Sequence, residues 1–329
     1  APPSYIEAAL HSRPLAMLFA LSLIATYAGG FNMLCSYNLQ STFSGYSFYS
    51  PEWTPWIIGG IVALLTGYCV MGGGKRIIAV ASTLVPFMGG LYVLVALIVI
   101  VMNLELVPTV FARIFQGAFD FQAIFAGFTG SALMQGIKRG LYSNEAGMGS
   151  TPHAHAQANV TDPHDQGVVA MVSVFIDTFI VLTLNALVII STLYTADGPL
   201  ANGYVGEVTS QLNNTNLAQT AFGTVMGSGV GSAFVAICLF FFAFSTILGW
   251  NLFGKINTIY LFGQKSTTIY TIVALVFIFL GTVTSNDLVW ALTDMFNFLM
   301  VIPNAIALFA LTRMVLRTTH GIGDNRPKK

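Results

Sequence analysis

Residues 138–153 read KRGLYSNEAGMGSTPH, a polar and glycine-rich stretch that lies between apolar segments. Polar groups at membrane depth are costly, so they usually face a cavity or a solute pathway. The glycines and the proline also weaken a helix and free its backbone amides and carbonyls to bind a solute. The stretch therefore indicates a break in a solute-binding membrane helix. The alternative is a helix that ends at the cytoplasmic interface, with Gly147 and Gly149 as its cap glycines.

The composition places the chain in a membrane. Hydrophobic residues make up 55% of the 329 residues and charged residues only 8%, whereas soluble domains carry about 25% charged residues. The lipid bilayer is therefore one partner. The formal net charge is zero, which argues against nucleic acid as another. No pattern indicates an organic cofactor.

Eight segments are apolar and long enough to span a bilayer, which takes about 20 residues per helix. They are residues 14–40, 55–72, 77–102, 122–150, 167–194, 219–253, 267–284 and 288–312. Their connections are short apart from a polar loop at about 195–218. We therefore predict an all-α integral membrane protein with one membrane domain over residues 1–329.

The charged residues predict the orientation, because basic residues collect on the cytoplasmic side. If the spans alternate, one side holds Arg13, Lys75, Arg76, Lys255, Lys265, Arg313 and Arg317. The other side holds Glu52, Glu105, Asp120, Asp197, Glu207 and Asp287, with Arg113 as the one basic exception. This pattern predicts a multi-pass protein of the cell (inner) membrane with both ends in the cytoplasm. Residues 313–329 would form a basic cytoplasmic tail.

The Ser143–Ser150 stretch offers hydroxyls, an amide, a carboxylate and open backbone. Half-helix ends at a break would attract a carboxylate with their N-termini and an ammonium or sodium ion with their carbonyls. Lys138 and Arg139 could pair with Glu145 or Asp120.

Adjacent hydroxyls at Ser245 and Thr246 lie within the sixth predicted span. Hydroxyl and carbonyl oxygens together suit a small cation, although such hydroxyls also commonly bond back to the preceding helical turn. Trp250 would be either a belt residue at the membrane surface or a wall of the pocket.

Acidic residues inside predicted spans indicate ion or proton handling. Asp177 lies deep in the fifth span, whereas Asp294 is nearer the outer surface and could be solvated. Asn32, Ser36 and Asn38 follow one another along the first span, where they would line a pathway or bind helices together.

Two further patterns have ordinary readings. His153, His155 and His164 do not have the spacing of a zinc motif, which favours an interfacial loop over a metal site. The run at 227–231, GSGVG, is typical of small-residue helix packing or of a loop that enters the sixth span.

The stretch KRGLYSNEAGMGSTPHA (138–154) closely resembles the signature of the sodium:alanine symporter family, also called alanine-or-glycine:cation symporters. Other segments resemble the same family in the same order. They are GGGKRIIAVASTLVPFMGGLY (72–92), DTFIVLTLNALVI (177–189), FAFSTILGWNLFGK (242–255) and LTDMFNFLMVIPNAIAL (292–308).

The resemblance implies a LeuT-type fold, which has two inverted repeats of five helices, each with a broken first helix. The eight spans would then be the third to tenth helices of a partial inverted-repeat bundle. The opening residues APPSYIE resemble a divergent form of the segment that follows the family's first two helices. The resemblance therefore implies that those two helices, and also the eleventh, are missing.

It further implies sodium-coupled symport of alanine, glycine or a similar small neutral amino acid by alternating access, with sodium as the co-transported ion. On this basis the substrate contacts would be Ser143, Asn144, Ala146, Gly147, Gly149, Phe244, Trp250 and Asn38. Ser245 and Thr246 would bind sodium, and Glu145 would be a structural anchor for the broken helix.

Three alternatives remain at this point. Proton coupling would use Asp177 as the ion-coupling residue. A membrane enzyme would use Glu145 with the nearby histidines. A non-transporting fragment or sensor would fit a chain that lacks helices. The sequence does not rank alanine against glycine or serine, and it gives no indication of the oligomeric state.

Overall fold

A computed structural model describes residues 1–119, 131–195, 198–201, 212 and 216–319. The first half comprises α1 (Pro2–Leu10), α2 (Arg13–Ile24), the π-helical turn η1 (Ala25–Gly30), α3 (Phe31–Ser41), α4 (Thr54–Met71), α5 (Gly73–Met102), the 3-10 turn η2 (Leu104–Leu106) and α6 (Val107–Ala118). The second half comprises α8 (Ser131–Asn144), α9 (Pro152–His155), α10 (Pro163–Phe175), the π-helical turn η3 (Ile176–Val181), α11 (Leu182–Leu193), α13 (Asn216–Met226), α14 (Ser228–Phe262), the 3-10 turn η4 (Gln264–Ser266), α15 (Thr267–Gly281) and α16 (Asn286–Thr319).

Seven helices in this described part are long and apolar enough to cross a membrane. They correspond to all of the predicted spans except the fourth. Two of them, Arg13–Ser41 and Pro163–Leu193, contain a π-helical turn near the middle. The fourth predicted span, 122–150, begins outside the described residues, and its described helix, α8, ends at Asn144. The protein is therefore an all-helical, multi-pass membrane protein over the residues described.

The sixth predicted span, 219–253, is wrong as a single helix. The chain turns at Gly227, whose φ of 86° favours glycine, so α13 and α14 are separate helices. They meet through small residues, since a Cβ on Gly231 would lie 2.4 Å from the backbone nitrogen of Gly223. The glycine run therefore serves as a loop into the span and as close packing, as two of its readings predicted.

Local signals explain several helix boundaries. Proline occupies the first turn of α2, α4, α6, α9 and α10, where its missing N–H costs nothing. The Asp162 carboxylate caps α10 by accepting the His164 backbone N–H at 2.9 Å. At the other end of the chain, α16 continues to Thr319, so the first residues of the predicted tail are helical.

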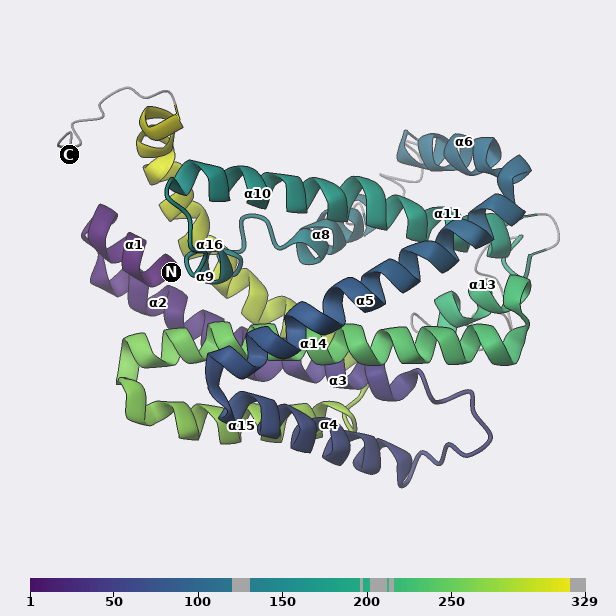
Figure 1. Ribbon diagram of the computed structural model, residues 1–329, viewed down its shortest axis with the longest axis horizontal. Helices are drawn as coiled ribbons and strands as arrows, with labels where there is room; N and C mark the ends of the chain where they lie inside the picture. Colours follow the sequence, from purple (N-terminus) through teal and green to yellow (C-terminus); the bar gives the residue numbers. More distant parts are fainter. Residues whose placement is uncertain (120–130, 196–197, 202–211, 213–215, 320–329) are drawn as a thin grey trace.

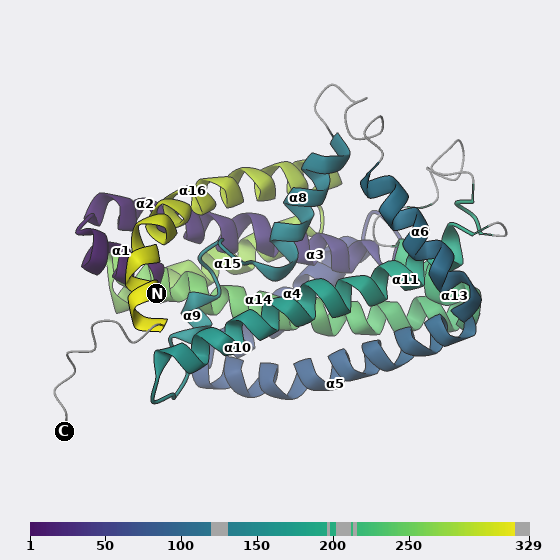
Figure 2. The same ribbon diagram turned by 90° about the horizontal axis from the view of Figure 1, so that it is seen from above.

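The long helix α14 is the axis of the fold and contacts α2, α3, α4, α5, α13 and α15 (Figure 1). On one side of it lie α3, α4 and α15. On the other side lie α8 and α10 (Figure 1), while α16 packs along α2 and η1 (Figure 2). The two segments that flank residues 145–151, namely α8 and α9, therefore lie beside this central bundle.

Buried polar pairs join the helices of the bundle. The amides of Asn32 on α3 and Asn251 on α14 exchange hydrogen bonds of 3.4 and 3.1 Å. The Tyr270 hydroxyl of α15 donates to the same Asn251 oxygen at 3.3 Å. All three side chains are buried. Of the two interpretations of Asn32, the structure therefore favours the one in which this residue binds helices together.

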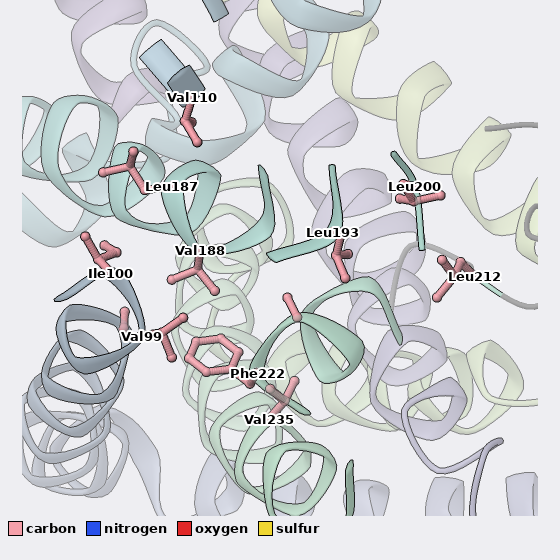
Figure 3. Close-up of a cluster of buried hydrophobic side chains, with 12 residues drawn as sticks. Val99, Ile100, Val110, Leu187, Val188, Leu193, Leu200, Leu212, Phe222 and Val235 are labelled. Atoms are coloured by element: carbon pink, nitrogen blue, oxygen red, sulfur yellow. The ribbon is translucent and has the colours of Figure 1, made fainter. Parts of the chain in front are cut away.

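A wholly apolar cluster closes one end of the molecule, where α5, α6, α11, α13 and α14 converge (Figure 3). Its buried members are Ala96, Val99, Ile100, Val110, Leu187, Val188, Leu193, Leu200, Leu212, Ala221, Phe222 and Val235. A second cluster includes Phe19, Tyr27, Phe31, Met148 and Met300. Because Met148 belongs to the polar stretch, this second cluster places that stretch against the bundle.

Candidate functional site

The helix breaks within the stretch that the sequence singled out. α8 ends at Asn144, and α9 begins only at Pro152. Between them Glu145, Gly147 and Gly149 adopt left-handed backbone angles, with φ of 53°, 84° and 93°. Glycine adopts such angles without penalty, whereas a glutamate there needs outside support. The Asn144 side chain stabilises the turn by accepting the Ala146 backbone N–H at 2.9 Å.

Neighbouring helices fix the backbone of the break. Asn304 of α16 donates to the Gly147 carbonyl at 2.7 Å and accepts the Tyr5 hydroxyl of α1 at 2.7 Å. A Cβ on Gly149 would lie 2.7 Å from the Phe19 ring and 2.9 Å from Cγ of Asn304. Glycine is therefore required at position 149 both by its φ and by this close approach.

Glu145 connects the break to two long helices. Its Oε1 accepts the indole N–H of Trp250 on α14 at 2.8 Å, and its Oε2 accepts the Tyr27 hydroxyl at 3.4 Å. Both partners are neutral, although the sequence suggested a basic one. Tyr27 lies in η1, halfway along the 29-residue span Arg13–Ser41. The break therefore lies deep beside the spanning helices, which favours a broken membrane helix over one that ends at the interface.

Aromatic rings form one wall beside the break. The Phe31 ring lies 4.6 Å from that of Trp250 and 5.4 Å from that of Tyr142, measured between centroids. Tyr27 lies 5.6 Å from Trp250. The sequence indicated Trp250 as a wall residue but not Tyr27 or Phe31. Their spacing of four residues on one helical face, next to a Gly-Gly pair, was the available signal.

The basic residues of the stretch bind Asp294 of α16. Lys138 Nζ and Arg139 Nη1 each lie 3.5 Å from an Asp294 oxygen, and the Tyr142 hydroxyl donates to the same carboxylate at 2.7 Å. The guanidinium of Arg139 also lies over the Trp290 ring, 3.9 Å from its centroid. The predicted partner Glu145 was wrong, and Asp120 lies outside the described residues. Asp294 is thus paired instead of freely solvated.

Asp177 and the end of α8 come together. The Ser143 hydroxyl donates to Asp177 Oδ2 at 2.7 Å, and the Asn144 amide donates to the Thr178 hydroxyl at 2.9 Å. Both acceptors lie in η3, the π-helical turn of the span Pro163–Leu193. Turns of this type occur frequently at functional sites. The ion-coupling candidate therefore adjoins the broken helix.

Three other predicted site residues lie apart from the break. Phe244 packs among Cys69, Val70, Ile77 and Leu248, away from the Trp250 face of α14. Ser245 bonds back to the Phe242 carbonyl at 3.0 Å, the ordinary alternative to a cation contact. Asn38 lies seven residues beyond Phe31, about 10 Å further along the helix. The contacts thus group Trp250, but not these residues, with Glu145.

Two open grooves, both lined mainly by apolar atoms, flank the break. They share Ala146, Gly147 and Leu308. The predicted contacts at Ala146, Gly147 and Gly149 therefore line accessible space, which a solute-binding backbone requires.

His153 fixes the C-terminal side of the break to α14. Its Nδ1 donates to the Ser150 carbonyl at 2.9 Å, so its Nε2 accepts the Asn257 amide at 2.7 Å. The imidazole stacks on Phe253, with ring centroids 5.4 Å apart. The residue is 1% exposed and lies in the short helix α9, so the expectation of a loop was wrong for it. No three potential metal-binding side chains gather among the residues described.

Burial lowers the pKa of His153 from 6.5 to about 4. The folded protein thus binds this proton more weakly than the unfolded chain, and stability falls as pH drops from about 6.5 to about 4. We expect a loss of about 3 kcal/mol over that window. Thermal unfolding in detergent at pH 4.5 and 7.5 measures it. His153→Gln should flatten the pH dependence, and the exposed control His164→Gln should leave it intact. Equal slopes in all three proteins would contradict the assignment.

The sequence of the chain is similar to those of several known proteins. A family model described as the sodium:alanine symporter family matches residues 1–328. The chain is 36% identical to the sodium/alanine symporter AgcS of Methanococcus maripaludis, over 83% of this chain and 58% of the relative. It is 39% identical to a sodium/proton-dependent alanine carrier protein of a Bacillus species, over 80% of this chain and 61% of the relative.

A third relative is a probable sodium/glutamine symporter, GlnT, of Bacillus subtilis. It is 34% identical over 95% of this chain and 62% of the relative. The chain thus spans about three fifths of the length of these curated relatives.

Proposed function

Because the chain belongs to the sodium:alanine symporter family, we propose that its protein carries out sodium-coupled symport of alanine, glycine or a similar small neutral amino acid. The observation that supports this most is the broken helix at residues 145–151, fixed at depth by Glu145 and open to a groove at Ala146 and Gly147. The family consists of transporters, so the membrane-enzyme alternative has no support from it.

The proposed substrate site uses the chemistry of the two helix ends. Backbone amides and carbonyls of Ala146, Gly147 and Gly149 would bind the carboxylate and ammonium of the amino acid, together with Ser143 and Asn144. The aromatic wall around Trp250 would limit the length of the side chain. Glu145 would anchor the break without touching the substrate.

The proposed mechanism is alternating access. We place the eight predicted spans as the third to tenth helices of a LeuT-type fold, with both chain ends on the cytoplasmic side of the cell membrane. Sodium would favour the outward-open state, and joint binding of sodium and amino acid would permit closure and inward opening. Coupling is then a difference in affinity between the two states. Ser245 and Thr246 remain the predicted sodium ligands on α14.

Uptake of labelled alanine into proteoliposomes tests the proposal. The protein in its full natural length should accumulate alanine when an inward sodium gradient is imposed, and not with potassium in its place. Excess unlabelled alanine should block uptake of the labelled alanine. Inhibition by excess unlabelled glutamine measures how strictly the aromatic wall selects by side-chain size. Alanine uptake that is equal with sodium and with potassium would overturn the proposal.

Proton coupling is the second candidate, because one relative is named a sodium/proton-dependent alanine carrier. It predicts uptake that an inward pH gradient drives without sodium. Asp177→Asn would abolish that uptake, because an amide cannot bind and release the proton.

A further inference from the structure

The corner between α4 and α5 carries two adjacent cations. α4 ends at Met71 and α5 begins at Gly73, whose φ of 81° turns the chain back. Lys75 and Arg76 follow in the first turn of α5, and both are exposed. The turn between α14 and α15 lies at the same end of the molecule (Figure 1). Because α4 and α5 are both apolar enough to span a membrane, this corner lies where the lipid headgroups begin.

A third cation reaches the same corner from α14. Lys255 Nζ donates to the Val70 carbonyl at 2.8 Å, and Arg76 Nη1 donates to the Tyr68 carbonyl at 2.9 Å. Both carbonyls belong to the end of α4 and are two residues apart, so the two cations bind neighbouring points of one helical turn. An ammonium and a guanidinium each carry several N–H donors. These contacts therefore leave donors on both groups for a further ligand.

Packing fixes the corner and its cations. Val70 packs with Ile77 of α5 and Leu248 of α14 in one buried apolar cluster. The guanidinium of Arg76 lies over the Tyr68 ring, 4.6 Å from its centroid, which is a favourable cation–π distance. Two of the three cations are thus held at defined positions, unlike charges on a free loop.

The helices that carry these cations have an uncompensated positive charge. Residues 54–102 and 228–281, which are all described, contain no Asp or Glu. They comprise α4, α5, α14, η4 and α15. The basic residues within them are Lys75, Arg76, Lys255 and Lys265.

Acidic side chains from other elements touch α14 on different faces. Glu7 binds the Tyr260 hydroxyl, and Glu145 accepts the Trp250 indole N–H. Each of these α14 residues is five positions from Lys255, which is about 140° around the helix. Neither carboxylate therefore lies on the Lys255 face, and the positive charge of the corner attracts an anion.

Exposed apolar side chains adjoin the cations. Tyr68 and Met71, in the last turn of α4, are 69% and 78% exposed. Side chains of this kind at the end of a spanning helix contact the interfacial region and the acyl chains. A soluble anion would match the cations but leave these side chains in water, whereas a phospholipid offers both an anionic headgroup and apolar chains. The corner therefore fits a phospholipid better than a free phosphate.

We propose that Lys75, Arg76 and Lys255 bind the headgroup of an anionic phospholipid, whose acyl chains lie against Tyr68 and Met71. Phosphate oxygens accept strong charge-assisted hydrogen bonds from arginine and lysine. The bound headgroup would join the start of α5 to α14 across the end of α4. A ligand that binds only the folded protein stabilises it, so the lipid should raise the stability of this corner. The inference does not depend on the proposed symport.

Thermal unfolding of the full-length protein in detergent tests the site. Dioleoyl phosphatidylglycerol, which is anionic, should raise the melting temperature by about 5 °C when it is well above its dissociation constant. Dioleoyl phosphatidylcholine has the same acyl chains but no net charge, and it should raise the melting temperature much less. Glycerol 3-phosphate carries the phosphate without the chains and should have no effect.

Variants that remove charge assign the effect to the corner. A cation at a membrane surface contributes about fivefold to the binding of anionic lipid. Lys75→Gln and Arg76→Gln should therefore each raise the phosphatidylglycerol concentration for the half-maximal shift by about fivefold. Arg76→Lys keeps the charge and should retain most of the affinity. The control Arg313→Gln removes an exposed cation from α16 and should leave the titration unchanged.

The outcomes separate the lipid from its alternatives. If Arg76→Gln fails to fold because it loses the bond to the Tyr68 carbonyl, the exposed Lys75→Gln carries the test. Equal shifts with both lipids, or an unchanged phosphatidylglycerol titration in the folded corner variants, would overturn the site. Stabilisation by glycerol 3-phosphate that equals that by phosphatidylglycerol would overturn a lipid as the occupant.

Discussion

Gly281→Ala is expected to cost the protein about 3 kcal/mol of stability, near the upper end for overpacking a well-packed contact. Gly281 is the last residue of α15 and lies against the backbone of α3. A Cβ there would lie 2.5 Å from Cα of Met33 and 2.6 Å from its carbonyl oxygen. Carbon atoms in contact prefer about 3.5–4.0 Å, so the two helices would have to separate by about 1 Å.

The melting temperature of the purified protein in detergent, with its yield from membranes, measures this effect. Gly60→Ala is the matched control, because Gly60 lies within helix α4 and a Cβ there would meet no atom within 4 Å. Alanine suits a helix better than glycine by up to about 1 kcal/mol, so the control should be neutral or slightly stabilising. Equal melting temperatures for Gly281→Ala and Gly60→Ala would show that α3 and α15 do not approach this closely.

The sequence was sufficient for features that depend on local composition. Hydropathy located six spans within about five residues, because a membrane helix needs a long apolar run wherever it packs. It placed the sixth span, Ser228–Phe262, nine residues too early. The break was also predictable, since Gly147 and Gly149 adopt angles that glycine alone reaches cheaply. Gly227 shows the limit of this reasoning. The glycine run at 227–231 indicated a loop, but the apolar residues on both sides of it made 219–253 resemble one span, so α13 and α14 were not separated.

The partners of the site residues were not predictable, because they depend on how distant helices pack. Glu145 binds Trp250 and Tyr27, which are 105 and 118 positions away in the sequence. Lys138 binds Asp294, 156 positions away. Charge alone favoured nearer partners for Lys138 and Arg139. Their actual partner, Asp294, depends on the register between α8 and α16, which composition does not encode.

Two site candidates that were predicted for separate reasons, Asp177 and Ser143, lie together in the structure. Asp177 and Ser143 were candidates for different reasons, and nothing in the sequence links a residue of the fifth span with one in the break. The structure places them 2.7 Å apart because η3 lies against the end of α8. Conversely, Ser245 and Phe244 are neighbours of the Trp250 segment in sequence but direct their side chains elsewhere on α14.

Glu145→Ala is expected to lower the rate of sodium-driven alanine uptake about a hundredfold. The carboxylate accepts hydrogen bonds from Trp250 at 2.8 Å and Tyr27 at 3.4 Å. A hydrogen bond contributes about 0.5–1.5 kcal/mol, so the two bonds contribute up to about 3 kcal/mol. Alanine would also have to hold the left-handed angle at position 145 without them. A loss of about 3 kcal/mol from the competent geometry corresponds to about a hundredfold.

Two companion variants separate the anchoring role of Glu145 from a general loss of folding. Glu145→Gln keeps an oxygen that can accept the Trp250 indole N–H, so its uptake should fall only about tenfold, the effect of about 1.4 kcal/mol. Glu105→Ala removes an exposed glutamate in η2 and should have no effect. Initial uptake rates are compared at equal amounts of folded protein, as judged by thermal unfolding. If Glu145→Ala transports like Glu105→Ala, the broken helix keeps its geometry without this carboxylate, and Asn304 with its bond to the Gly147 carbonyl becomes the main anchor.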